Sequence, residues 1–340
     1  MTTTEHVQTP SGLKPLRLAF GLLLGAGLFA FLVHRFRLTA VLAPLHTLGW
    51  GGLALLIVSQ LALIVLAALA WRLLSASRVA DGWWRFIWGR LIRDSASQVL
   101  PFVQLGGIVA GVRAMTLSGF ESGFAIASTM VDLAIEFVSE LVYAALGLAL
   151  LRSLRPEQPF LTALFGLLVT LALLAGGFVV ALARGTHRLA GFFERFSAAL
   201  GHKLRVMAHA MHAIRARPRP LLGAFVVHLL AWVLTGLQTW LVLWLMGVPV
   251  SVSAAIIIDS LTFSIRSLAF MVPGALGVQE GAFVLIGGIF GVSPSAALAL
   301  SLARRARDIA IGVPVLCAWQ LAEGKRLWQR HGSLASQPRR

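Results

Sequence analysis

The stretch SIRSLAFMVPGALGVQEGAF, Ser264–Phe283, limits the folds that this chain can adopt. Most of its residues are apolar, but Arg266 and Glu280 are charged, and Pro273-Gly274 interrupts the helical pattern between them. Neither a soluble core nor a plain membrane span accommodates that combination well. Irregular backbone at membrane depth persists only where protein buries it or where it lines a water-filled cavity. We therefore interpret the stretch as part of a cavity inside a membrane protein.

The composition indicates a membrane protein with several spans. Of the 340 residues, 58% are hydrophobic and only 12% are charged, whereas about a quarter of the residues are charged in soluble domains. The one cysteine, Cys317, lies in an apolar run, so we expect neither a disulfide framework nor a thiolate metal site.

Six apolar runs are long enough to cross a bilayer as helices, which takes about 20 residues. They are Leu16–Val33, Leu48–Leu74, Gly123–Leu151, Phe160–Ala183, Leu221–Met246 and Pro294–Ala322. Two further regions, Trp84–Val112 and Val252–Gly291, are apolar but carry charges and a central proline, so each is predicted to form a re-entrant hairpin of two short helices. The predicted fold is an all-α integral membrane protein, a single polytopic domain over residues 1–340 with six full spans and two re-entrant helical hairpins.

The distribution of basic residues predicts that the N- and C-termini are both cytoplasmic. In that orientation the cytoplasmic tails and loops, with Arg90 and Arg93 included, hold 21 of the 29 lysines and arginines. External loops hold four, and membrane segments hold the other four. This asymmetry is the positive-inside rule. The net charge of +16 therefore reflects topology, and we do not expect nucleic-acid binding.

The cytoplasmic segment 184–220 is strongly basic and has apolar residues at helical spacing. It carries eight lysines and arginines against a single glutamate. Two interpretations stay open: an amphipathic helix on the inner leaflet, or a helix packed on the cytoplasmic ends of the bundle. His209 and His212 share a face of this helix, but no acidic residue or cysteine accompanies them, so we predict no metal site.

A shift of 172 residues overlays the two interrupted regions. Pro101 falls on Pro273 and Gly119 falls on Gly291. Three charged positions also match, namely Glu136 with Asp308, Asp94 with Arg266 and Asp132 with Arg304. Because one hairpin would enter from the cytoplasm and the other from outside, we predict an inverted repeat, with repeat 1 at about 84–151 and repeat 2 at about 252–322. Two independent proline breaks are the alternative.

Seven of the thirteen acidic residues fall in predicted membrane segments. Each costs at least about 2.5 kcal/mol at the bilayer centre, so each needs a partner. Asp132, Glu136 and Glu140 are spaced four apart and form one stripe on a helix. Since like charges repel, we predict that this stripe faces the arginine cluster Arg304-Arg305 and Arg307 of the second repeat.

The predicted transport cavity combines the embedded charges with the residues of the breaks. Its candidate residues are Arg93, Asp94, Asp132, Glu136, Glu140, Asp259, Arg266, Pro273, Gly274, Gly277, Glu280, Arg304, Arg305 and Asp308. Free backbone N–H groups at a helix break can bind an anionic or hydroxylated head group. The alternative is a set of buried ion pairs that only fix the fold, although such pairs stabilise less than apolar packing.

Enzyme signatures are missing from the sequence. It contains no GxSxG, HExxH, Walker A or CxxC motif and no Asp-rich Mg²⁺ signature. We therefore predict that the protein is not an enzyme and uses no cofactor or metal. The embedded carboxylates still leave a membrane-bound transferase as an alternative.

The C-terminal third resembles a known family. The run VPGALGVQEGAFVLIGGIFGVSPSAALALSLARRARD is similar to the Pro-Gly-x-x-Gly-x-x-Glu signature, with its downstream arginine span, of the lysylphosphatidylglycerol synthase transmembrane-region family. Within that family, RDSASQVLPFVQLGG and RRARDIAIGVPVLCAWQ resemble the hopanoid-biosynthesis-associated membrane proteins. The resemblance implies a lipid-translocating domain of the bacterial inner membrane, with roles for Pro273, Gly274, Gly277, Glu280 and Arg304. No soluble aminoacyltransferase domain follows Leu327, so lysyl transfer is not expected.

The expected function is lipid flipping or transport, with a hopanoid-type or other polycyclic or polar lipid as cargo. The alternative is an intramembrane lipid-modifying transferase, or an accessory that presents lipid to a biosynthetic enzyme. The expected partners are membrane lipids and, through the resemblance, proteins of hopanoid synthesis or export. The sequence leaves the oligomeric state open.

Overall fold

The computed structural model describes residues 38–75, 82–99, 104–159, 161–174, 176–177, 209–269, 272 and 275–335. All regular structure in these ranges is helical, which confirms the all-α prediction. The main helices are α2 (Leu38–Ser75), α3 (Trp83–Val99), α4 (Gln104–Leu117), α5 (Ser122–Leu154), α8 (Pro218–Leu245), α9 (Val252–Leu268), α10 (Val278–Ile289) and α11 (Pro294–Ala335).

Three described helices are long and apolar enough to cross a membrane: Leu42–Ser75 within α2, and all of α5 and α8. They contain the predicted spans that begin at Leu48, Gly123 and Leu221. The predicted span Leu16–Val33 lies outside the described residues, and Phe160–Ala183 is described as a helix over Leu161–Leu174. The predicted Pro294–Ala322 lies within α11. The total of six spans therefore stays a prediction.

The two regions predicted to be hairpins each contain two helices that pack on each other, α3 with α4 and α9 with α10. Their breaks at Pro101 and Pro273-Gly274 lie outside the described residues. Local sequence explains where the following helices start. Ser293 Oγ accepts a hydrogen bond from the Ala296 backbone N–H (3.2 Å), and Pro294 is the first residue of α11. The re-entrant placement of the hairpins in a bilayer stays a prediction.

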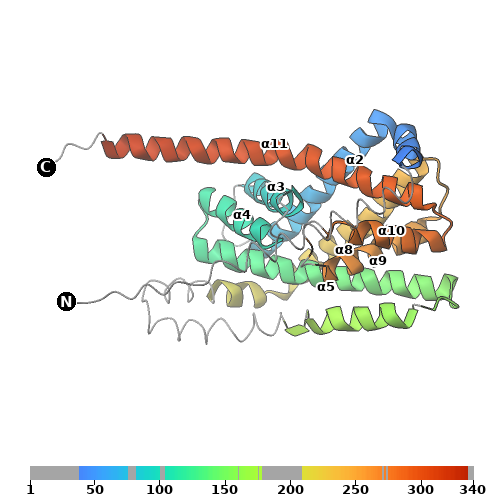
Figure 1. Cartoon of the computed structure of the whole chain (residues 1–340). Coiled ribbons are helices and arrows are strands. Elements are labelled where there is room, and N and C mark those ends of the chain that lie inside the picture. The colour runs from blue at the N-terminus through green and yellow to red at the C-terminus, as the bar shows by residue number, and fades with distance from the viewer. Residues whose placement is uncertain are drawn as a thin grey trace, which may run out of the picture.

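Helix ends recur at the offset that matches the sequence. α4 ends at Leu117 and α10 at Ile289, and both pairs of helix ends are 172 residues apart because α5 and α11 begin at Ser122 and Pro294. Gly119 (φ 95°) and Gly291 (φ 78°) turn the chain between those helices, in a region of φ that a Cβ atom disfavours. α5 and α11 run in opposite directions along the bundle (Figure 1).

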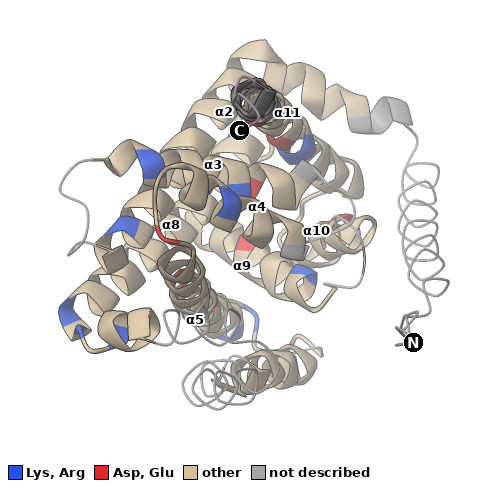
Figure 2. Cartoon of the chain, turned by 90° about the vertical axis from the view of Figure 1, so that its left-hand side faces the viewer, with Lys and Arg blue, Asp and Glu red and all other residues tan. Residues whose placement is uncertain are grey.

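Two apolar clusters hold the helices together. One joins α8, α9, α10 and α11 through residues such as Leu243, Ile257 and Phe283. The other joins α2, α3, α4 and α5 through residues such as Trp71 and Phe86. Along α2, α5 and α8 a stretch rich in polar residues lies between the parts that enter each cluster, and Figure 2 shows charged positions in the middle of the bundle.

Most of the basic segment 184–220 lies outside the described residues, which resume at residue 209. At its described end, Met211 and Ile214 are 1% and 5% exposed and belong to the cluster that contains Trp71. This end therefore packs on the bundle, as the second interpretation of the segment expected. α8 begins at Pro218, inside the predicted segment.

Candidate functional site

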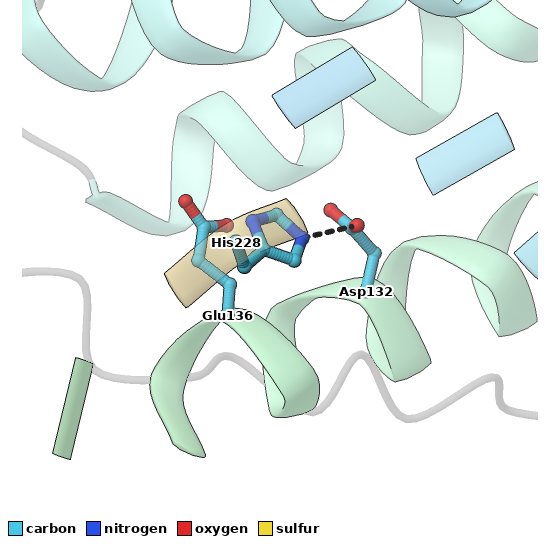
Figure 3. Close-up of side chains that lie close together, drawn as sticks. All are labelled: Asp132, Glu136 and His228. Atoms are coloured by element: carbon cyan, nitrogen blue, oxygen red, sulfur yellow. Dashed lines mark hydrogen bonds and ion pairs between the residues drawn. The ribbon is translucent and has the colours of Figure 1, made fainter. Parts of the chain in front are cut away.

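A first group of charges joins α3, α5 and α8. Asp132 and Glu136 lie one turn apart on α5 and face Arg90 and Arg93 of α3. The Arg93 Nη1–Asp132 Oδ2 distance is 2.7 Å, Arg90 Nη1–Glu136 Oε2 is 3.1 Å, and Arg93 also pairs with Glu136. His228 of α8 lies between the two carboxylates, with Nε2 3.0 Å from Asp132 Oδ1 (Figure 3). We call these five residues the α3–α5 cluster.

The α3–α5 cluster corrects two predictions. The acidic stripe was expected to face the arginines of α11, but Asp132 and Glu136 pair with α3 instead, because α3, α8 and α9 are the helices packed beside this part of α5. Arg90 and Arg93 were counted with the cytoplasmic loops, yet they are only 5% and 4% exposed. Their spacing of three residues on one helix face was the available signal for Arg90.

A second group surrounds Asp259 of α9, which is fully buried. Arg304 of α11 forms an ion pair with Asp259. Three hydroxyl groups donate to the same carboxylate: Tyr143 at 3.1 Å, Thr235 at 2.7 Å and Thr239 at 2.8 Å. We call these five residues the Asp259 cluster. The hydroxyl donors were missed, because single hydroxyls on apolar helices give no charge signal.

Arg304 is closely enclosed. It is 5% exposed, and its guanidinium lies over the rings of Phe263 and Phe283 at 5.6 and 5.3 Å from their centroids. Its Nε is buried and has no hydrogen-bond partner, although its Nη2 contacts Asp259. Arg304 therefore retains unused hydrogen-bonding capacity.

Glu280 of α10 forms a third group, and it is fully buried. Its Oε2 accepts from the Gly277 backbone N–H (2.7 Å) at the start of α10, and its Oε1 accepts from Ser301 Oγ (2.8 Å). Arg305 Nη2 lies 2.8 Å from Oε1. Glu280 thus caps a helix and pairs with Arg305, so its partner is not Arg304 and it does not line the pocket described below.

The remaining charges lie near α9 and α11. Arg307 donates to Asp308 Oδ1 (2.8 Å) and to Gln238 Oε1 (2.6 Å). Glu140, the last residue of the acidic stripe, accepts a hydrogen bond from Ser267. Arg266 donates to two neutral amide oxygens, at 3.2 Å and 2.6 Å, and forms no ion pair with a described carboxylate.

A pocket of about 180 Å³ lies among these groups and is lined by α2, α3, α5, α8, α9, α10 and α11. Its charged lining residues are Arg90, Asp94, Glu136, Arg266, Arg304, Arg307 and Asp308. We call it the polar pocket. Of the candidates from the sequence, Asp94, Glu136, Arg266, Arg304 and Asp308 line it. Arg93, Asp132, Glu140, Asp259, Gly277, Glu280 and Arg305 are not among its lining residues, and Pro273 and Gly274 lie outside the described residues.

Asp132, Glu136 and His228 are the one group among the described residues with ligand atoms close enough for a metal ion, all within 4.8 Å of one another. Their carboxylate oxygens already accept from Arg90 and Arg93. Two guanidinium groups at this distance would repel a divalent cation, so the residues do not fit a metal site.

The comparison with protein families gives one match. The model described as the lysylphosphatidylglycerol synthase TM region matches residues 18–315, which is most of the chain. The chain belongs to this family. Comparisons with curated proteins and with solved structures gave no match. Membership of the lysylphosphatidylglycerol synthase transmembrane-region family indicates a membrane protein with a lipid-related function. The α3–α5 cluster, the Asp259 cluster and the polar pocket all lie within the matched range.

Proposed function

We propose that the protein moves a polar lipid between the leaflets of a membrane by way of the polar pocket. The observation that carries the proposal is a pocket with seven charged side chains in the interior of an apolar helical bundle. Burying charges is costly, and ion pairs that only hold the fold together would not need to surround an open space. A pocket of this kind provides a place for a lipid head group at membrane depth.

The repeated helices support transport in particular. Asp94 and Arg266 are 172 residues apart and both line the polar pocket, as do Glu136 and Asp308. The two halves therefore supply matched positions to one space, and α5 and α11 run antiparallel (Figure 1). Transporters with inverted repeats place the substrate at the interface between repeats and expose it to the two sides in turn.

The finer features of the proposal come from the sequence. The resemblance to hopanoid-associated proteins favours a hopanoid-type or other polycyclic lipid as cargo, with hopanoid biosynthetic or export proteins as partners. The positive-inside pattern places the protein in the bacterial inner membrane with both termini in the cytoplasm. On this proposal the charged groups bind and release lipid without chemical change.

The experiment is a leaflet-exchange assay in liposomes. Purified protein should move labelled lipids from the outer to the inner leaflet, and the mass of the lipid should stay unchanged. Arg304→Gln should lower the rate while retaining the folded protein, whereas the surface variant Arg113→Gln should leave it unchanged. A changed lipid mass would point to the transferase alternative. Exchange equal to that of protein-free liposomes, for every lipid class tried, would contradict transport.

A further inference from the structure

An apolar groove adjoins the polar pocket between α2 and α8. It has a volume of about 370 Å³, and its lining includes Ala62, Leu66, Leu234, Leu237 and Trp240. Apart from Ser59 and Gln238, every residue that lines it is apolar. We call it the outer groove.

The helix registers show how the two spaces are related. On α2 the outer groove uses Ser59, Ala62 and Leu66, and the polar pocket uses the residue after each of these. On α8 the same relation holds for Leu234 and Leu237. Successive residues of a helix differ by about 100° in direction. The polar pocket and the outer groove therefore lie on adjacent faces of the same two helices.

Two residues line both spaces, Leu63 of α2 and Gln238 of α8. They are 8% and 4% exposed, so they form a closed border between the spaces. Gln238 connects three helices across this border. Its Nε2 donates to Ser59 Oγ of α2 (2.7 Å), and its Oε1 accepts from Arg307 Nη1 of α11 (2.6 Å). Gln238 thus links the α2–α8 contact to a charged residue of the polar pocket.

The polar pocket is suited to an anion. Arg266 uses two N–H groups on neutral amide oxygens and pairs with no described carboxylate, and Arg304 has a buried Nε without a partner. Phosphate or carboxylate oxygens match guanidinium groups in charge and geometry. An apolar groove beside such a pocket complements an amphipathic molecule, whose head and tail need different surroundings.

We propose that one lipid with an anionic head group occupies both spaces, with its head in the polar pocket, its alkyl or polycyclic part in the outer groove, and its entry between α2 and α8 controlled by Gln238. This inference rests on the proposed function for its physiological meaning, but it concerns binding. A head group that draws Arg307 away from Gln238 removes one of the two side-chain hydrogen bonds of that amide. Binding of the head is thereby coupled to opening of the border.

The test is photo-crosslinking of the full chain in liposomes, followed by mass spectrometry of the labelled peptides. Phosphatidylglycerol carrying a diazirine at the end of one acyl chain should label the α2 and α8 residues of the outer groove. Leu237→Trp, which fills the groove, should reduce this labelling about tenfold. Leu230→Trp is the matched control, because Leu230 lies on α8 at 48% exposure and does not line the groove, and its labelling should match that of the wild type.

Three further comparisons test the head group and the border. Arg266→Gln should weaken the binding of phosphatidylglycerol about tenfold, which is the scale of a lost charge-assisted contact, and should leave phosphatidylcholine unaffected. Unlabelled phosphatidylglycerol should compete for the labelling, whereas inorganic phosphate alone should not. Gln238→Ala should speed the labelling of polar-pocket residues by the lipid.

Several outcomes would overturn the inference: equal labelling around the whole bundle, equal binding of the two lipids, full competition by inorganic phosphate, or unchanged labelling in Leu237→Trp. A failure of the proposed function is a separate result. If the groove is labelled as expected but no lipid exchanges between leaflets, the binding site stands and transport fails. If lipid exchanges without groove labelling, transport stands and this site fails.

Discussion

Removal of the Asp259 carboxylate is expected to destabilise the protein strongly. Asp259→Ala leaves the Arg304 guanidinium in the interior without its counter-ion, which costs about 3–5 kcal/mol. The Tyr143 hydroxyl loses its acceptor, which adds about 1–3 kcal/mol. The Thr235 and Thr239 hydroxyls lose less, because each also donates to a backbone carbonyl of α8, at 2.7 and 3.1 Å. The expected total is about 4–8 kcal/mol.

The assay is a double-mutant cycle on the free energy of unfolding in detergent micelles, with Asp259→Asn, Arg304→Met and the two together. Because the double variant strands no charge, it should be more stable than the sum of the single changes predicts, by about 2 kcal/mol or more. The matched control is Arg113–Glu323, an ion pair at 2.8 Å with Arg113 47% exposed. Its cycle should give about 0–1 kcal/mol. Additive effects at Asp259 and Arg304 would refute the view that this pair is a buried, coupled ion pair.

Two further predictions concern packing and topology. Gly236→Ala should destabilise the protein although alanine favours helices, because a Cβ atom there would collide with the Tyr143 hydroxyl and displace it from Asp259; Gly223→Ala on the same helix, with only one side-chain atom at 3.5 Å, should be neutral or stabilising in the same thermal unfolding measurement. Cysteines placed near Ser118 should react with an impermeant reagent only from the cytoplasm and those near Val250 only from outside, and labelling of both from one side would contradict the inverted topology.

The sequence predicted which charges lie inside the bundle better than it predicted their partners. Asp132 and Glu136 stand out because they lie one turn apart on a long apolar helix, and that spacing is local information. Their pairing with Arg90 and Arg93 depends on which helix packs beside α5, and no local pattern records this. Arg90 and Arg93 follow a tryptophan-rich start that resembles a membrane interface, so their burial was missed.

Helix breaks show the same division. The offset of 172 residues locates the ends of α4 and α10 and the starts of α5 and α11, because glycines and prolines act locally on the backbone. The role of Glu280 was misjudged for a different reason. A glutamate three residues after Gly277 can either face a cavity or cap its own helix, and only the folded geometry decides between them.

The order of the paired charges along the chain has a consequence for biosynthesis. In the first half the arginines of α3 are synthesised before the carboxylates of α5, so a nascent chain that has reached Leu154 already carries both members of the Asp132–Arg93 pair. In the second half Asp259 emerges first, and its cation follows only with α11. Ribosomal synthesis runs from the N-terminus, so the half-made second repeat must hold an acidic group in apolar surroundings until α11 is inserted. The insertion machinery therefore has a reason to retain α9 and α10 until the last helix arrives.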